Sequence, residues 1–441
     1  MKKKVLSVIY LVLCLGLCLS LSVGMLFTGP AQAGANEQLT EKPALRTEEG
    51  TVNTEYLEQL PDWLRDHFFL RQEMISLDHR FSAVLFHTSG DADVLLGSNG
   101  WLYYTDTLAD YTGTDPMTQR ELFTAANNLR LMSQYCQAQG RQFRFMIAPN
   151  KNSLYSAHMP NYGVRANVTD AQRLMALLEE YDVPTVDLFT AFRQEKEILY
   201  FAHDSHWNTK GAALGADLVN AAFGVESGYY QGDFSQRIPH DGDLYAMLYP
   251  AFNDPEKDFV YGGKLDYTFT TSATRPDAIV LNTQGAGDKE LLVYRDSFGN
   301  LLYPFLADSY ATARFSRSTA YDLTYEADCV LVELVERNLR YLTENLPVMP
   351  APQVDLNRPD AVSGSVAVTA AKRGKWLQVK GQLPEIDENS SIYVICGDTA
   401  YEAFCLEQSG FGLYLDPECT PEYAMCTVNG VPTMFKIEIS K

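Results

Sequence analysis

Short apolar runs alternate with helical patterns through the middle of this chain, and this alternation constrains the fold more than any other feature. Buried strands are predicted at 142–148, 184–188, 278–282, 290–294 and 329–334. Helices are predicted at about 118–139, 169–181 and 209–222, and a further helix begins after residue 300. Strands that alternate with helices indicate an α/β fold with a mostly parallel sheet covered on both faces.

One stretch between two of these elements carries a candidate for chemistry, Tyr200-Phe-Ala-His-Asp-Ser-His-Trp-Asn-Thr-Lys-Gly211. It places Asp204 two residues before His206, and a carboxylate beside an imidazole can orient the ring and stabilise its protonated form. Asn208 can cap the helix that follows, so the pair is predicted on a loop at a helix entrance. By itself the pair is also compatible with a histidine that is merely hydrogen-bonded.

A second stretch supplies a possible partner, since the buried strand at 291–294 leads into Arg295-Asp-Ser-Phe-Gly-Asn300 and then into a helix. A serine on a strand-to-helix turn is exposed at the carboxyl end of the sheet, where open α/β sheets bind ligands. The helix amides behind Ser297 can stabilise an oxyanion. Ser297 alone could simply cap a helix.

A serine hydroxyl needs a base, and the base needs an orienting acid. The combination therefore predicts Ser297 as nucleophile, His206 as general base and acid, and Asp204 as the residue that orients His206. Asn150 and Lys151, which end the strand at 142–148, are oxyanion or substrate-binding candidates. Trp207 could stack on a sugar ring or pack the loop. Arg295 could bind a carboxylate of a sugar, although pairing with an acid of the protein is favoured.

The N-terminus has the pattern of a targeting segment. Lys2, Lys3 and Lys4 precede an uncharged apolar run at 5–27, and Pro30-Ala-Gln-Ala33 resembles a cleavage site before Gly34. Both a cleaved signal peptide and a retained signal anchor fit this pattern, and either predicts an exported body, at the cell surface or outside the cell. The formal charge of −21 excludes a basic nucleic-acid footprint, so no nucleic-acid partner is expected.

The chain is predicted to divide into four parts: 1–33 as signal peptide or anchor, 34–55 as a polar stalk, 56–346 as the α/β domain and 353–441 as a small all-β domain. The Pro347-Val-Met-Pro-Ala-Pro352 segment marks the change from helical to two-residue periodicity. The short alternating runs after it predict a sandwich. Four cysteines crowd this last part, Cys396, Cys405, Cys419 and Cys426, and in an exported protein we expect them to be at least partly oxidised.

Several motifs give the chain a resemblance to a known family. The segments Asp204-Ser-His-Trp207 and Asp296-Ser-Phe298 resemble the signatures of SGNH-hydrolase-like proteins related to alginate O-acetyltransferases, and in particular the DHHW family. Further matching segments are Asp66-His-Phe-Phe-Leu-Arg71, Gly97-Ser-Asn-Gly-Trp-Leu-Tyr-Tyr104, Ala148-Pro-Asn-Lys151 with Tyr155, Gly242-Asp-Leu244 and Val335-Glu-Arg337. Ser205 stands where the DHHW name implies a histidine. The resemblance covers roughly residues 40–345 and leaves out the C-terminal β domain.

The resemblance implies an SGNH-hydrolase-like three-layer domain in which the Asp-His pair precedes the serine. It also implies a ping-pong reaction in which Ser297 accepts an acetyl group and passes it to a hydroxyl of a polysaccharide. With water as acceptor, the same residues would form an acetylesterase. The family analogy suggests a membrane-bound O-acyltransferase as acetyl donor. No cofactor or metal is expected.

Two other readings stay open. In a metal-dependent hydrolase, ligands would come from a set of six residues: His203, Asp204, His206, His240, Asp241 and Asp243. That reading leaves the serine turn unexplained. In a non-catalytic surface or glycan-binding protein, the chain would keep the fold without turnover.

Overall fold

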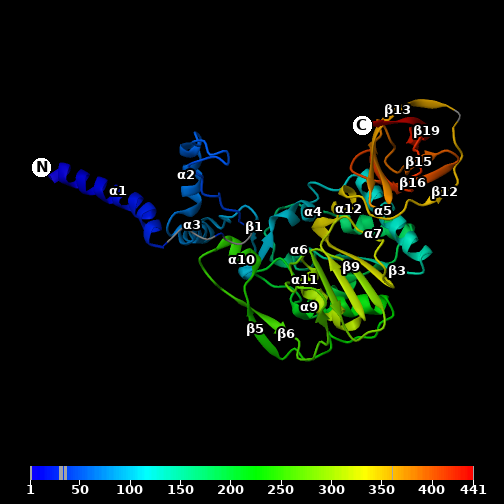
Figure 1. Ribbon diagram of the computed structural model, residues 1–441. Helices are drawn as coiled ribbons and strands as arrows, with labels where there is room; N and C mark the ends of the chain where they lie inside the picture. The colour runs from blue at the N-terminus through cyan, green and yellow to red at the C-terminus, as the bar shows by residue number, and fades with distance from the viewer. Residues whose placement is uncertain (1, 29–32, 34–36, 360, 441) are drawn as a thin grey trace.

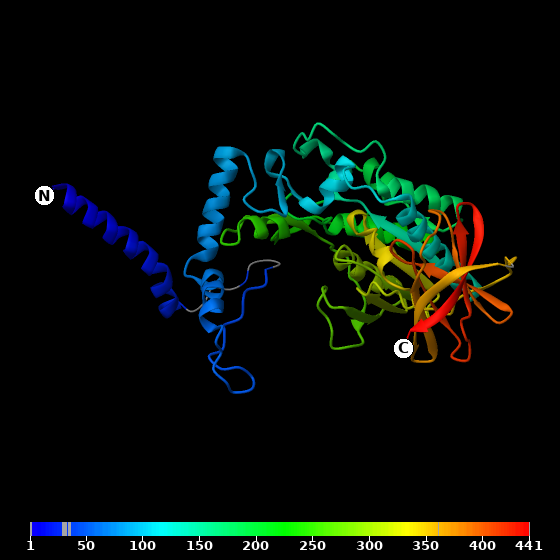
Figure 2. The same cartoon turned by 90° about the horizontal axis from the view of Figure 1, so that it is seen from above.

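The computed structural model describes residues 2–28, 33, 37–359 and 361–440. Three parts follow one another along the molecule in Figures 1 and 2. The N-terminal helix α1 (Lys2–Thr28) projects from the body, an α/β domain occupies the middle, and a β domain lies at the far end.

The central sheet of the α/β domain has seven strands in the order β4-β3-β11-β9-β10-β8-β7. Their bounds are β3 Gln142–Ala148, β4 Thr185–Val186, β7 Thr268–Phe269, β8 Val280–Gln284, β9 Glu290–Tyr294, β10 Thr312–Ser316 and β11 Cys329–Val335. The five strands in the order β4-β3-β11-β9-β10 are parallel to one another. Strand β8 is antiparallel to β10, and β7 is antiparallel to β8. The sheet is therefore mixed and mostly parallel, as predicted.

Helices cover both faces of this sheet because successive strand residues point to opposite sides. On β3, Phe143, Phe145 and Ile147 pack with one apolar cluster, and Met146 and Ala148 with the other. Helices α5 (Gln119–Ala138) and α7 (Asp170–Glu180) belong to the first cluster. Helices α8 (Leu188–Gln194), α9 (Thr209–Ala222) and α11 (Gly299–Ser309) belong to the second. The domain thus has three layers.

Most predicted elements agree with the structure to within two residues at each end, and strand β10 is a clear departure. It was not predicted, because Arg314 interrupts its apolar pattern. Residues 56–86 form two helices, α2 (Tyr56–His67) and α3 (Arg71–Phe86), and Leu70 between them has a left-handed φ of 61°.

Several shorter helices and strands also belong to the α/β domain. They are β1 Val94–Leu96, β2 Leu102–Tyr104, α4 Leu108–Thr112, α6 Lys151–Leu154, α10 Asp243–Leu248 and α12 Tyr341–Glu344. Two strands, β5 (Gln236–His240) and β6 (Glu256–Val260), form a separate antiparallel hairpin outside the main sheet. This hairpin, which we call the β5–β6 hairpin, was not predicted.

The C-terminal domain is all-β, as predicted, but its strands close into a barrel and do not form a sandwich. The order is β12-β16-β15-β18-β19-β13-β14-β17, and an additional pairing of β16 with β17 closes the ring. The bounds are β12 Gln353–Val354, β13 Val362–Arg373, β14 Trp376–Gln382, β15 Ile392–Cys396, β16 Thr399–Cys405, β17 Gly410–Leu415, β18 Tyr423–Val428 and β19 Val431–Ser440. Closure removes the free strand edges that a sandwich would leave.

Helix α5 joins the barrel to the α/β domain. Asn128 is buried, donates to the carbonyls of Leu342 and Cys405, and accepts from the Cys405 N–H. Arg130 forms an ion pair of 2.5 Å with Glu402 on β16. These buried polar contacts couple the two parts, because leaving any of the groups unpaired would cost free energy.

The described cysteines are all free thiols, so the predicted oxidation of the C-terminal cysteines stays a prediction. Tyr401 contacts the Cys419 sulfur at 3.7 Å. Burial and the neighbouring Cys419 thiol raise the pKa of Cys396 to about 12. These two thiols are therefore neighbours within the barrel.

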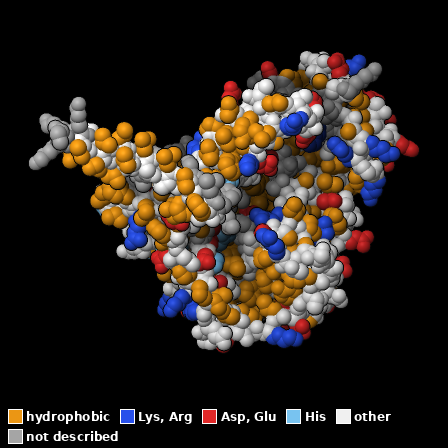
Figure 3. All heavy atoms as spheres, turned by 60° about the vertical axis from the view of Figure 1, so that its left-hand side comes forward, with side chains coloured by type: hydrophobic (Ala, Val, Ile, Leu, Met, Phe, Trp, Pro, Cys, Tyr) orange, Lys and Arg blue, Asp and Glu red, His pale blue; other side chains and the backbone are white. Residues whose placement is uncertain are grey.

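Figure 3 shows hydrophobic side chains gathered along the projecting N-terminal helix. None of the helices among the described residues combines the length and the hydropathy of a membrane span. The predicted cleavage before Gly34 lies outside the described residues. In the predicted stalk, Glu37 pairs with Arg71 at 2.5 Å and Thr40 donates to Asp66, so this segment contacts α2 and α3.

Candidate active site

The two predicted stretches meet at the carboxyl end of the central sheet. Asp204 and His206 lie on the loop before α9, where the Asn208 side chain accepts from the Gly211 N–H as the predicted cap. Ser297 follows β9 directly and precedes α11. The predicted helix entrance and strand-to-helix turn are therefore confirmed.

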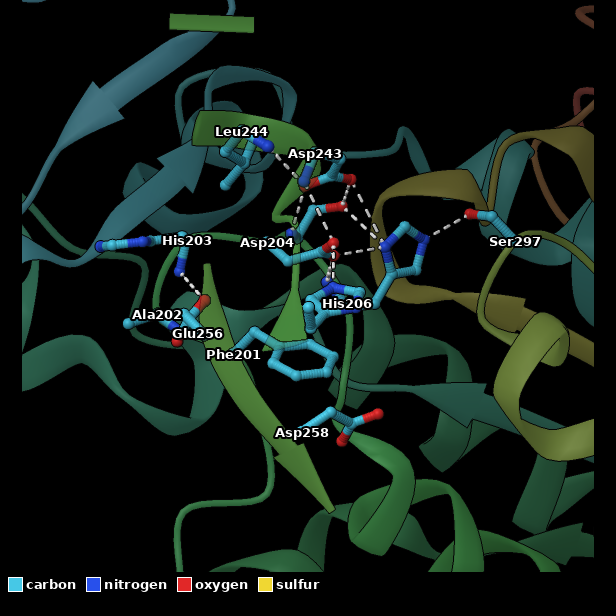
Figure 4. A network of polar contacts seen from close by, with 12 residues as sticks. Phe201, Ala202, His203, Asp204, His206, Asp243, Leu244, Glu256, Asp258 and Ser297 are labelled. Carbon is cyan, nitrogen blue, oxygen red and sulfur yellow. Dashed lines mark hydrogen bonds and ion pairs between the residues drawn. The ribbon is translucent and has the colours of Figure 1, made fainter. Parts of the chain in front are cut away.

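The three side chains form one hydrogen-bonded chain (Figure 4). His206 Nδ1 donates to Asp204 Oδ1 at 2.8 Å, and Ser297 Oγ lies 2.8 Å from His206 Nε2. Asp204 also accepts from the His206 N–H at 2.9 Å, which fixes the loop. The geometry is that of a nucleophile, a base and an orienting acid.

The charges of the pair stabilise each other. Burial alone would raise the pKa of Asp204, but His206 and then His240 hold that pKa well below its ordinary value. Burial lowers the pKa of His206, and the Asp204 and Asp243 carboxylates raise it more, to about 9. His206 is therefore protonated at neutral pH in the free protein and becomes a base as pH rises.

A second carboxylate lies beside the same imidazole nitrogen. Asp243, the first residue of α10, has Oδ2 3.4 Å from His206 Nδ1. It also accepts from the Ser205 N–H at 2.7 Å and from the Ser205 hydroxyl at 2.6 Å. His206 thus faces two acids, of which Asp204 is the nearer and the more buried.

The serine turn is held by acidic residues behind it. Asp296 accepts from the Phe298 N–H at 2.9 Å and from the Val335 N–H at 2.7 Å, which ties the turn to the end of β11. Glu333 accepts from the Asp296 N–H. Burial, followed by the Asp296 charge, raises the pKa of Glu333 well above its ordinary value.

The Ser297 backbone N–H and the Asn150 side chain are the candidate donors for an oxyanion. The Ser297 N–H meets no acceptor among the described residues and lies just before α11. A backbone N–H at this point can donate to a developing oxyanion. Asn150 is fully buried, and neither atom of its side-chain amide has a partner within the described chain. Asn150 thus keeps its place as a candidate donor.

Three of the predicted binding residues are buried and bind the protein itself. Lys151 is 4% exposed and donates to the carbonyls of 201, 202 and 204, and burial lowers its pKa to about 8. Trp207 is 0% exposed and donates to the Phe298 carbonyl. Arg295 is 3% exposed and donates to Asn300 and to two backbone carbonyls. The packing role that was allowed for Trp207 and the internal pairing that was favoured for Arg295 agree with these contacts, and substrate binding by any of the three stays a prediction.

The metal alternative predicted a wider set of ligands than the structure assembles. Within the described chain, Asp204, His206 and Asp243 form the group of three whose ligand atoms lie within 4.8 Å of one another. His203 points away from them, stacking on Tyr245, and Asp241 is exposed. The carboxylates of Asp204 and Asp243 already accept several N–H groups each, which favours an acid-base site.

Further residues belong to the site: Glu256 and the position of Arg337 were not predicted as part of it, and His240 was named only as a possible metal ligand. His240 donates from Nε2 to Asp204 Oδ2 at 2.9 Å, and Glu256 accepts from the N–H groups of 202 and 203. Arg337 lies 5.5 Å from the Phe298 ring and 5.4 Å from the Tyr104 ring. Of these residues, Arg337 alone lies in a segment noted for its resemblance, Val335-Glu-Arg337.

A cleft of about 950 Å³ is lined by other described residues and includes none of the three triad residues. Residues of α7 and α8 form its walls, and Ser153 and Glu336 lie at one end. Burial and the nearby Asp110 raise the pKa of Glu336 to about 7. The volume of this cleft therefore does not indicate which residues react.

Comparisons with known proteins bear on the fold. No curated protein matches the chain. Among solved structures, a DHHW family protein from Eubacterium siraeum has 18% identity over 51% of this chain and 90% of its own, with a TM-score of 0.40. Bacillus cereus PatB1 has 18% identity over 56% of this chain and 97% of its own, with a TM-score of 0.43. Pseudomonas aeruginosa AlgX has 13% identity over 78% and 92%, with a TM-score of 0.38. At such low values these likenesses carry no chemical conclusion.

A family comparison is more direct. Residues 94–251 match the family described as the SGNH hydrolase-like domain of acetyltransferase AlgX. The match includes Asp204, His206, His240 and Asp243, whereas Ser297 lies beyond it. The resemblance predicted from the sequence motifs is confirmed by this match over residues 94–251, which are similar to the SGNH hydrolase-like domain of acetyltransferase AlgX.

Proposed function

We propose that this chain is a serine-dependent enzyme that transfers acetyl groups, as an O-acetyltransferase or acetylesterase acting on a polysaccharide. The observation that carries the proposal is the continuous contact from Ser297 through His206 to Asp204. The match to a domain described for an acetyltransferase supports the choice of acyl group. The proposal gives each of the three residues the role that the sequence predicted.

The reaction follows from the positions of the atoms. Neutral His206 takes the Ser297 proton at Nε2 while Oγ attacks the acetyl carbonyl carbon. The oxyanion that forms accepts a hydrogen bond from the Ser297 backbone N–H. His206 then gives its proton to the leaving group, which leaves acetyl-Ser297. An acceptor hydroxyl attacks this ester and His206 takes its proton. The bond between the acetyl carbon and Ser297 Oγ then breaks, Oγ takes the proton back from His206, and the acetyl group is left on the acceptor. Water in place of the acceptor gives acetate.

Asn150 would add a second donor to the oxyanion, because its buried Nδ2 has no partner among the described residues. An asparagine that donates in this way should be needed for rate and dispensable for folding. In Asn150→Ala, turnover should fall by roughly 10²-fold or more, as is typical for a lost oxyanion donor. Unchanged turnover would remove Asn150 from the site.

We further propose that the chain acts outside the cytoplasm, at the cell surface or as an extracellular protein, on a glycan acceptor. The basic and apolar N-terminus supports export. A membrane-bound O-acyltransferase would fit as acetyl donor, because acetyl groups for an exported enzyme must be carried across the membrane. Fractionation of the native host, with and without residues 1–33, tests the location.

Intact mass spectrometry after incubation with 4-nitrophenyl acetate tests the chemistry. Wild type should gain one acetyl group, and peptide mapping should place it on Ser297. Ser297→Ala should gain none, whereas Ser318→Ala, which removes an exposed serine of a nearby loop, should behave as wild type. Release of the adduct by an oligosaccharide indicates a transferase, and release by water alone indicates an esterase.

The same experiment decides between the alternatives. A chain with no Ser297-dependent adduct and no turnover would be a binding protein that keeps the fold. Turnover that a chelator abolishes, and that a serine-directed phosphonate leaves unchanged, would indicate the metal-dependent mechanism. We expect the opposite pattern, loss with the phosphonate and no effect of the chelator.

A further inference from the structure

The β5–β6 hairpin supplies side chains to the catalytic loop although it lies outside the central sheet. Glu256 accepts from the N–H groups of Ala202 at 2.7 Å and His203 at 2.5 Å. Asp258 is buried and accepts from Thr209 at the start of α9. Both ends of the loop that carries Asp204 are thus fixed by β6, as Figure 4 shows for Glu256.

The other strand of the hairpin reaches Asp204 itself. His240 Nε2 donates to Asp204 Oδ2 at 2.9 Å, and the His240 ring stacks on Phe201 with centroids 3.9 Å apart and planes 9° apart. Asp204 Oδ1 meanwhile accepts from His206 Nδ1 at 2.8 Å. Each oxygen of the buried carboxylate therefore accepts a hydrogen bond from one imidazole ring.

We infer that His240 is a positioning residue for acetyl transfer, which holds Asp204 from the side opposite His206 and extends the catalytic chain to four residues. The inference rests on the proposed function, because it assigns His240 a part in the reaction of Ser297. His240 touches none of the reacting atoms and acts through Asp204 alone.

Charge gives His240 a second effect on the base. The groups that face it are the Phe201 ring and the carboxylates of Asp204, Glu256 and Asp258. Burial lowers the pKa of His240, but the hydrogen bond to Asp204 and the three carboxylates raise it above its ordinary value. A positive His240 partly neutralises the negative charge of Asp204, so that Asp204 stabilises the protonated form of His206 less. Without His240, the pKa of His206 should rise.

Three variants of the full chain separate these effects. His240→Phe keeps an aromatic ring on Phe201 and removes the donor. His240→Gln keeps an uncharged donor. Asp241→Asn changes the next residue, which is exposed and makes no contact with Asp204, and serves as the matched control.

With 4-nitrophenyl acetate, kcat of His240→Phe should fall roughly ten- to hundredfold, since a charge-assisted hydrogen bond is lost, while KM stays within about twofold. His240→Gln should recover much of kcat. The midpoint of the rate against pH should move upward in both His240 variants. Asp241→Asn should match wild type in rate and midpoint. Equal kcat and equal midpoints in wild type and His240→Phe would overturn the inference.

A readout without turnover keeps the test decisive. If wild type shows no Ser297-dependent acetylation, the proposed function fails, and NMR titration of the His206 ring then decides the role of His240. We expect the His206 pKa to rise by about one pH unit in folded His240→Phe. If that variant does not fold, His240→Gln gives the same test because it is also uncharged. An unchanged His206 pKa in the folded variant refutes the inference.

Discussion

Replacing Asp204 by asparagine is the most informative single change in this molecule. The two carboxylate oxygens accept four N–H groups, those of His206 Nδ1, the His206 backbone, His240 Nε2 and the Asp243 backbone. An amide has only one acceptor oxygen, so in either orientation its NH₂ group faces two donors. Two hydrogen bonds are lost, and the charge that stabilises protonated His206 is lost with them.

The size of the effect follows from these contacts. Each hydrogen bond to a charged group contributes about 1.5–3 kcal/mol, so two lost bonds correspond to roughly 10²- to 10⁴-fold in rate. Losing the carboxylate of an isolated Ser-His-Asp triad costs about 10⁴-fold. Here Asp243 lies 3.4 Å from the same His206 nitrogen and can partly replace Asp204. We therefore expect kcat of Asp204→Asn to fall on the order of 10²- to 10³-fold, below the loss of an isolated triad.

The assay is steady-state hydrolysis of 4-nitrophenyl acetate, with the extent of Ser297 acetylation measured by mass. The Asp204→Asn/Asp243→Asn double variant should be at least about tenfold slower than Asp204→Asn, because the replacement acid is gone. Asp241→Asn should match wild type, since its exposed side chain faces solvent. Wild-type turnover in Asp204→Asn, or a double variant no slower than the single one, would refute the reasoning.

Three further predictions concern pH, stability and oxidation. Below about pH 9 His206 is protonated and cannot take the serine proton, so the rate on a small ester should rise with pH up to that value; a rate that is flat between pH 6 and 9 would contradict it. Asn128→Ala leaves buried backbone groups unpaired between α5 and the barrel and should lower the free energy of unfolding by about 3 kcal/mol in urea denaturation, whereas Gln137→Ala, at an exposed position of the same helix, should change it little. On oxidation, Cys396 and Cys419 should form the first bridge, and peptide mapping that finds another pair first would disprove this.

The central strands and the serine turn could be predicted because their signal is local. Residues 142–148 and 290–294 are apolar, short and bounded by polar residues, and the structure places β3 and β9 at these residues. A buried strand followed at once by a polar turn and a helix can hardly place its serine anywhere except at the carboxyl end of the sheet. The meeting of Ser297 with His206 then follows from the fold and not from either stretch alone.

The β5–β6 hairpin could not be predicted because its strands lack the pattern of a strand. Gln236-Arg-Ile-Pro-His240 contains a proline, and Glu256-Lys-Asp-Phe-Val260 is mostly charged. Hydrogen bonds to the catalytic loop help to hold this hairpin in place, and Phe259 is its side chain packed against the core. The periodicity of the sequence therefore does not indicate this hairpin. The role of His240 depends on its contact with Asp204, from which it is separated by 36 positions in the sequence.

Lys151, a predicted binding candidate, and Glu256, which was not predicted, both hold the loop that carries Asp204. The segment that carries Asp204 has little regular structure, so its backbone groups need partners from elsewhere. Lys151 satisfies three of its carbonyls, and Glu256 satisfies two of its N–H groups. Polar residues near a predicted triad are thus partners of the loop before they are partners of a substrate. A triad on a loop is accurate only when such buried partners fix the backbone, which is why changes in them should alter kcat more than KM.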